Sequence, residues 1–283
     1  MSYRRVWRKC VNGLMLGLTG LCALVTVSVL FFILGYLVWH GGRALDWDFI
    51  TRLPKPVGES GGGMANAIVG SAKLLLLAAL VGLPAGFMGG LYLAEFGGRT
   101  FPFLVRYTAD LLNGVPSIVM GIFAYTVVVL PMHHFSALAG GLALGVMLIP
   151  IVLRSTEDFL RAVPGSLREG ALALGANKWR AIATVVVPAA VRGIATGMLL
   201  GLARVAGEAA PLVFTSFSNR FWGSGFNAPT ASLPVMIYTY ALSPYDDWHR
   251  QAWAAGLVLL ALVLVANVGA RLILARKQSP ARG

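Results

Sequence analysis

Residues 166–188 read SLREGALALGANKWRAIATVVVP, a segment of charged and small residues that lies between long apolar runs. Ser166 and Glu169 have the spacing of a capping box, so we expect a short helix to begin there. Gly175 is placed to end that helix in the left-handed conformation, and Asn177 is placed to cap a second helix. The segment therefore predicts two short helices joined by a sharp bend, an arrangement typical of a docking element.

The rest of the chain is strongly apolar, since 57% of its 283 residues are hydrophobic and only 12% are charged. This composition excludes an ordinary soluble domain and predicts an all-α, polytopic integral membrane protein. Six runs come near the length of about 20 residues that crosses a bilayer as a helix. These six predicted transmembrane helices are Val11–Val38, Leu74–Ala94, Leu111–Met132, Phe135–Leu153, Gly193–Phe217 and Gln251–Ala270.

The distribution of basic residues predicts the orientation of these spans. If both termini are cytoplasmic, 16 of the 23 Lys and Arg residues lie in inner segments, six lie in outer segments, and Arg204 lies within the membrane. An excess of Lys and Arg marks the cytoplasmic side, so we expect a multi-pass protein with both termini inside. The net charge of +12 also favours contact with anionic membrane lipid. The basic residues are scattered over separate loops, which argues against a nucleic-acid partner.

The chain is expected to have three parts. Residues 1–60 form an uncleaved signal-anchor helix and an outer loop, residues 61–276 form the transmembrane domain, and residues 277–283 form a cytoplasmic tail. The run Gly61–Gly63 is interpreted as flexible linker, because the features of a phosphate loop do not surround it. Residues 233–240 predict a helix at the membrane interface, either as a capping surface for an external partner or as a plain membrane-surface helix.

Two residues of the fifth span are the main candidates for contact with a substrate. A charge at the position of Arg204 costs about 2.5–3.5 kcal/mol in the bilayer, so its side chain should face protein or water. Glu208 follows four residues later, which places it on the same helical face. A guanidinium binds phosphate-like oxyanions through two parallel hydrogen bonds, and a carboxylate accepts a proton from a partly protonated oxyanion but repels sulfate. A structural ion pair between the two side chains is the alternative.

Two further candidates lie near the inner end of the third span. The sequence Asn113-Gly114-Val115-Pro116-Ser117 should break the helix, and Ser117 would then line the substrate path. Asp110 lies just before the break; a capping or snorkelling role is the alternative for this lone acid.

Catalytic chemistry has little support in the sequence. G-x-S-x-G, H-E-x-x-H and a spaced Cys/His set are absent, and His133 with His134 is too small a group for a metal site. We therefore expect no catalytic residue, no cofactor and no metal, and a protein that is not an enzyme.

The residues of the opening segment resemble the EAA loop of ABC-importer permeases. The resemblance rests on Glu169, Ala171, Gly175, Val185 and Pro188. The chain departs from the pattern by small apolar replacements at Gly170, Val185 and Val187. In the family this loop, here about residues 157–188, docks on a separate ATPase subunit. The resemblance implies that coupling involves Glu169, Gly170, Ala171, Leu174 and Gly175.

Three further stretches resemble the PstA-type permease subunits of phosphate-specific ABC importers: residues 64–70, 115–121 and 203–212. This resemblance implies a type I (MetI-like) permease core in the bacterial inner membrane that forms half of a pore for inorganic phosphate. It also implies as partners a second permease of the PstC type, a cytoplasmic ATPase dimer and a periplasmic phosphate-binding protein. Other hypotheses are a permease for phosphonate or sulfate, a phosphate-signalling scaffold, and an enzyme acting on lipid phosphates.

Overall fold

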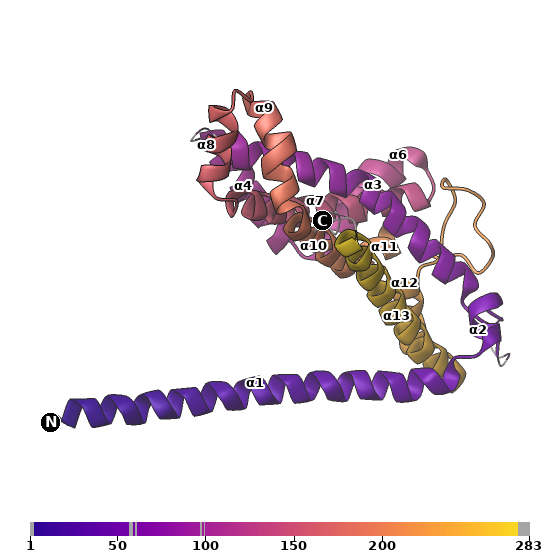
Figure 1. Cartoon of the computed structure of the whole chain (residues 1–283). Coiled ribbons are helices and arrows are strands. Elements are labelled where there is room, and N and C mark those ends of the chain that lie inside the picture. The colour runs from indigo at the N-terminus through magenta and orange to yellow at the C-terminus, as the bar shows by residue number, and fades with distance from the viewer. Residues whose placement is uncertain (1–2, 57–58, 60, 97, 99, 277–283) are drawn as a thin grey trace.

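The computed structural model describes residues 3–56, 59, 61–96, 98 and 100–276, and its described elements are all helical (Figure 1). Five helices in this part are long and apolar enough to cross a membrane, and a bent helix pair brings the number to six if it counts as one span. Three of the five are α1 (Tyr3–Ala44), α3 (Ala65–Glu95) and α7 (Ala137–Arg161). The fourth, Lys178–Ala206, ends in α10 (Val187–Ala206), and the fifth, Asp246–Leu272, belongs to α13 (Asp246–Arg276). The prediction of an all-α, polytopic membrane protein is confirmed.

Shorter helices join these spans. They are α2 (Trp47–Thr51), α4 (Thr100–Gly114), α5 (Ser117–Ala124), the π-helical turn η1 (Tyr125–Val129), α6 (Leu130–Met132), α8 (Gly165–Ala173), α9 (Lys178–Ala181), the π-helical turn η2 (Ile182–Val186), α11 (Ala210–Thr215) and α12 (Leu233–Ala241).

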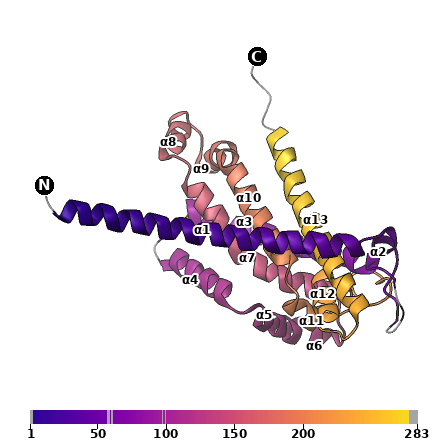
Figure 2. The same cartoon turned by 90° about the horizontal axis from the view of Figure 1, so that it is seen from below.

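Helix α1 extends away from the other helices and contacts α13 only near its own C-terminal end (Figures 1 and 2). The two helices touch closely at Gly41, where an added Cβ would lie 2.7 Å from the Trp253 carbonyl oxygen. The Tyr36 ring packs edge-on against Trp253, with 5.1 Å between ring centroids. Most of α1 is exposed and apolar, so this helix lies at the periphery of the fold.

Helices α3 and α7 form the centre of the molecule and touch along a seam of glycines. Gly82, Gly86 and Gly90 recur every fourth residue, so they share one face of α3. A Cβ added at Gly86 would lie 2.7 Å from the Val152 Cβ, and one at Gly82 would lie 2.7 Å from the Leu148 Cβ. Glycine therefore allows the two helices to lie closer together than any larger residue would permit.

The third predicted span, Leu111–Met132, is not a continuous helix. Helix α4 ends at Gly114, and the chain turns by 103° before α5 begins at Ser117. Pro116 explains the break, because proline lacks an N–H group and disfavours helical geometry at the residue before it. The expected break is confirmed, and α4 extends back to Thr100, well before the predicted start of the span.

Both π-helical turns precede a proline. Pro131 follows η1 and Pro188 follows η2, each by two residues, and the residue directly after each turn bonds to the carbonyl five residues back. In an α-helix the proline ring collides with the carbonyl four residues earlier. The wider turn relieves this collision, so both helices continue through their prolines.

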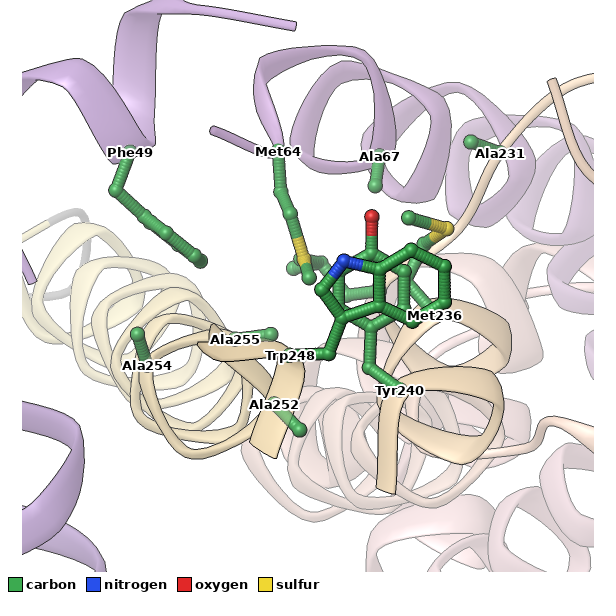
Figure 3. Packing of buried hydrophobic residues seen from close by; sticks show 11 residues of the cluster. Phe49, Met64, Ala67, Ala231, Met236, Tyr240, Trp248, Ala252, Ala254 and Ala255 are labelled. Atoms are coloured by element: carbon green, nitrogen blue, oxygen red, sulfur yellow. The ribbon is translucent and has the colours of Figure 1, made fainter. Parts of the chain in front are cut away.

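The predicted helix at residues 233–240 is confirmed as part of α12 (Leu233–Ala241), while its position at the membrane interface stays a prediction. Leu233, Met236 and Tyr240 of this helix are buried against α3 and α13. The Tyr240 and Trp248 rings stack with 4.2 Å between centroids inside this cluster (Figure 3). The apolar face of the segment therefore packs within the protein, where it gains the same release from water that an interface would provide.

The prediction that Gly61–Gly63 form a flexible linker is wrong. In its described part Gly61 donates its N–H to Asp247 at 3.3 Å, and its carbonyl accepts from Gln251 at 3.1 Å. A Cβ added at Gly63 would lie only 2.6 Å from the Phe49 carbonyl oxygen. The run thus packs closely against α2 and α13 instead of acting as a flexible linker.

We predict that Gly86→Ala destabilises the protein by about 1–3 kcal/mol, because the new methyl group must push α7 away. Thermal unfolding of the purified protein in detergent would measure the loss. Gly35→Ala is the control, since a Cβ there meets nothing within 4 Å and alanine favours a helix. Equal melting temperatures for Gly86→Ala and the wild type would show that the seam is not tight.

Candidate functional site

A cavity of about 230 Å³ lies where two broken helices meet α7. One wall comes from the α4–α5 break, another from α7, and a third from the end of α10 and the segment after it. The lining residues are Leu112, Asn113, Val115, Pro116, Ser117, Met147, Ile151, Arg204, Val205 and Glu208. Sequence analysis predicted three of these as path residues: Ser117, Arg204 and Glu208.

Arg204 lies in the last turn of α10 and lines this cavity. Its side chain is exposed, and it forms no hydrogen bond or ion pair with any residue that the structure describes. A guanidinium without an internal partner retains all its donors for a ligand. The structural ion pair with Glu208 is therefore not observed.

Glu208 reaches the same cavity for a reason that the sequence did not show. Helix α10 ends at Ala206, and Glu208 lies in the short segment before α11. The prediction that Arg204 and Glu208 share a helical face is thus wrong, although both residues line the same cavity. The chain leaves the helix at Gly207, and Pro211 lies in the first turn of α11.

Ser117 is the first residue of α5 and lies at the cavity. The N–H groups at the start of a helix lack partners within the helix, and the helix dipole makes this end favourable for anions. The side chain of Asn113, from the other side of the break, adds a polar amide. Together with Arg204, these groups form a polar site suited to an oxyanion.

Asp110, the fourth predicted path residue, does not line the cavity. Its carboxylate pairs with Arg154 of α7 through two hydrogen bonds, one of them 2.9 Å long between Nε and Oδ1. The pair fastens α4 to α7, so neither a simple cap nor a snorkelling acid describes this residue.

A charged cluster that was not predicted from the sequence surrounds Glu157, whose side chain is only 2% exposed. Its carboxylate contacts Arg106 at 2.7 Å, Arg161 at 3.1 Å and Arg154 at 3.5 Å. The sequence does indicate part of this cluster, because the spacing of Arg154, Glu157 and Arg161 places all three on one helix face. Arg106 was not identifiable, because it comes from a different helix.

The second candidate region is the α8–α9 hairpin, residues 165–181, which projects at one end of the molecule (Figures 1 and 2). The predicted capping box is wrong: α8 begins at Gly165, Pro164 occupies the cap position, and no side chain caps this end. Proline has a backbone angle suited to entering a helix, so the helix begins before Ser166.

The end of α8 confirms the prediction for Gly175. Its φ is +83°, its N–H bonds to the Leu172 carbonyl at 2.9 Å, and the next N–H bonds to the Ala171 carbonyl at 3.1 Å. These two bonds define a Schellman motif. Asn177 then caps α9 by accepting the Arg180 N–H at 2.8 Å, also as predicted.

The hairpin is anchored at its base and exposed at its tip. Arg168 bonds to Glu95 at the end of α3 at 2.8 Å, and Lys178 bonds to the Glu95 carbonyl at 2.7 Å. Leu174 at the bend is 91% exposed, and Glu169 is also exposed. An apolar side chain held in solvent on a rigid turn is suited to contact with another protein.

The comparisons with known proteins agree with these features. The family model described as binding-protein-dependent transport system inner membrane component matches residues 82–279. Among solved structures, a bacterial ABC transporter involved in the import of the acidic polysaccharide alginate has a TM-score of 0.63, with 15% identity, 98% of this chain covered and 100% of that chain. The inward-facing MetNI methionine ABC transporter has a TM-score of 0.59, with 17% identity, 75% of this chain covered and 93% of that chain.

The chain therefore belongs to the family of binding-protein-dependent transport system inner membrane components, and it has the fold of a MetI-like ABC importer permease. It is a transport permease subunit and not an enzyme.

Within that family it is of the PstA type. The phosphate transport system permease protein PstA of Yersinia pestis is 44% identical over 276 residues, which cover 97% of this chain and 94% of the relative. The protein of the same name from Haemophilus influenzae is 42% identical, covering 98% of each chain.

We predict that Gly175→Ala loosens the hairpin, because a left-handed backbone costs a residue with a Cβ about 1–2 kcal/mol. Hydrogen exchange of peptides from residues 165–181 should become faster. Gly170→Ala is the control, since it lies within α8 with no atom within 4 Å of an added Cβ. Unchanged exchange in Gly175→Ala would contradict the importance of the left-handed turn.

Proposed function

We propose that this chain is the permease subunit of an ATP-driven importer of inorganic phosphate and forms half of its translocation pore. The observation that carries the proposal is Arg204, a guanidinium at a cavity between broken helices that has no partner among the described residues. Its relatives named for phosphate transport support the choice of substrate. Helices broken at the substrate site are a general way for membrane proteins to present backbone groups to an ion.

In this proposal phosphate passes between Arg204, Glu208 and the start of α5 at Ser117. The guanidinium donates two hydrogen bonds to phosphate oxygens, and the first N–H groups of α5 add further donors. The Glu208 carboxylate accepts a hydrogen bond from a proton that phosphate still carries. Sulfate has no such proton at neutral pH and would be repelled by the same carboxylate.

The α8–α9 hairpin transmits the action of the ATPase. The proposed contact residues are Glu169, Gly170, Ala171, Leu174 and Gly175, which lie on or beside the exposed bend. Leu174 is the apolar anchor, while the bonds from Arg168 and Lys178 carry movement of the hairpin to α3. ATP-driven approach of two such hairpins would then change the opening of the pore.

The complete transporter requires partners. We propose a second permease of the PstC type for the other half of the pore, a cytoplasmic ATPase dimer on the hairpins and a periplasmic phosphate-binding protein on the opposite side. The excess of Lys and Arg in inner segments supports cytoplasmic termini. Residues 1–60 are then an anchor and outer loop, residues 61–276 the permease domain, and residues 277–283 a tail.

We predict that Arg204→Gln lowers ATP-driven uptake of labelled phosphate by about tenfold or more, since it removes a charged, two-pronged contact. The assay uses the complete complex in liposomes. Arg192→Gln is the matched control, because Arg192 is exposed on the same helix and does not line the cavity. Equal uptake by the Arg204 variant and the wild type would show that Arg204 does not lie on the substrate path. If the wild type takes up phosphonate or sulfate but no phosphate, the proposed substrate is wrong.

We predict that Glu208→Gln weakens the discrimination between phosphate and sulfate. Both anions would be added on the ATPase side, where they reach the permease without passing through the binding protein. Phosphate should inhibit wild-type uptake more strongly than sulfate does, whereas in the variant the two should become similar because the amide also donates hydrogen bonds. Glu59→Gln in the outer loop is the control. An unchanged ratio of the two inhibition constants would exclude Glu208 as the discriminating group.

A further inference from the structure

The proposed function assigns no role to the ion pair between Asp110 and Arg154. Asp110 belongs to α4 and Arg154 to α7, and the guanidinium donates to both carboxylate oxygens. Such a two-pronged pair is the geometry with which arginine also binds phosphate. The carboxylate therefore occupies donors that an oxyanion of similar shape would use.

The pair lies one helical turn from the cavity. Asn113 lines the cavity three residues after Asp110, and Ile151 lines it three residues before Arg154. Residues three apart on a helix share a face, with about 5–6 Å between their Cβ atoms. Because α7 continues from Arg154 toward α8, the pair lies on the side of the cavity that faces the α8–α9 hairpin. It thus joins α4 to α7 where an anion would leave the cavity toward the hairpin.

Arg154 is held mainly by Asp110, because Glu157 is occupied by other partners. The buried carboxylate of Glu157 has closer partners in Arg106 and Arg161, at 2.7 and 3.1 Å, than in Arg154 at 3.5 Å. Asp158 adds a third carboxylate near Arg154, so the three guanidinium groups are balanced by three carboxylates and the cluster carries no excess charge. The Asp110 side chain is 55% exposed, which allows it to turn away from Arg154 into solvent.

We propose that Arg154 is a second anion-binding group on the transport path and that Asp110 is its internal counter-ion, which a passing phosphate displaces. The inference rests on the proposed function, since it needs an anion in the cavity. Phosphate that leaves Arg204 takes the donors of Arg154, and α4 loses its bond to α7. After the anion departs, Asp110 pairs with Arg154 again and rejoins the two helices.

The test compares Arg154→Gln with Asp110→Asn in the reconstituted complex. The readout is the concentration of inorganic phosphate on the ATPase side that halves uptake. Asp110→Asn removes the competing carboxylate, so this concentration should fall by about tenfold, the factor that corresponds to one charged hydrogen bond. Arg154→Gln should raise it by a similar factor, and Arg154→Lys, which keeps the charge but not the fork, should lie between that variant and the wild type.

A matched control is available at another ion pair. Asp48→Asn breaks an exposed ion pair with Arg52, in which the two side chains are 3.1 Å apart. Asp48 belongs to α2 and Arg52 is the residue after this helix, so the pair is far along the chain from the residues that line the cavity. This substitution should leave the phosphate sensitivity unchanged. Thermal unfolding of each variant in detergent shows whether a change in sensitivity comes from a loss of fold.

The outcomes separate the possible explanations. A pair that only holds α4 to α7 is lost equally in Asp110→Asn and Arg154→Gln, so shifts in the same direction would overturn the role of Arg154 in anion binding. An unchanged phosphate sensitivity in Arg154→Gln would do the same, with the proposed function intact. A wild-type complex that takes up no phosphate would overturn both proposals together.

Discussion

The close contact between the backbones of α3 and α7 is the constraint on which the other parts of the structure depend. Gly82, Gly86 and Gly90 bring the two helices together along one seam. The end of α3 then holds the hairpin through Glu95, and the middle of α7 supplies a wall of the cavity. Since both regions belong to the packed pair of α3 and α7, a displacement of the hairpin is transmitted through these helices to the cavity.

The cavity lies where the interruptions of two helices meet. Pro116 separates α4 from α5, and the chain leaves helical geometry again at Gly207. Non-helical backbone at membrane depth is tolerated where protein or a polar cavity surrounds it. The interruption removes intrahelical partners from backbone groups, and Glu208 lines the cavity from the segment after α10, so the same breaks create both the space and its polar lining.

Local chemistry was predictable where a few neighbouring residues decide the conformation. Gly175 and Asn177 behaved as expected, because a left-handed cap and an N-cap each depend on bonds within one helical turn. Ser166 did not, since Pro164 offered an earlier start for the same helix. The residues 233–240 form the expected helix, but burial against α3 and α13 depends on partners far away in sequence.

The candidate site shows the same division. Arg204 and Ser117 were recognisable from a charge inside an apolar run and from a proline-linked break. The partner of Asp110 was not recognisable, because Arg154 lies 44 residues later and on a different helix. The buried position of Glu157 and its link to Arg106 were hidden for the same reason.

The sequence by itself determined the membrane class, the helical fold, the hairpin at residues 165–181 and the presence of an unusual arginine in the fifth span. These properties follow from composition, periodicity and contacts within one or two turns. Only the tertiary structure decided that Arg204 lacks a partner among the described residues, that Asp110 is paired, and that one face of α12 is buried. Such facts depend on which helix faces touch, and the free energy of that packing is shared among residues that no local pattern connects.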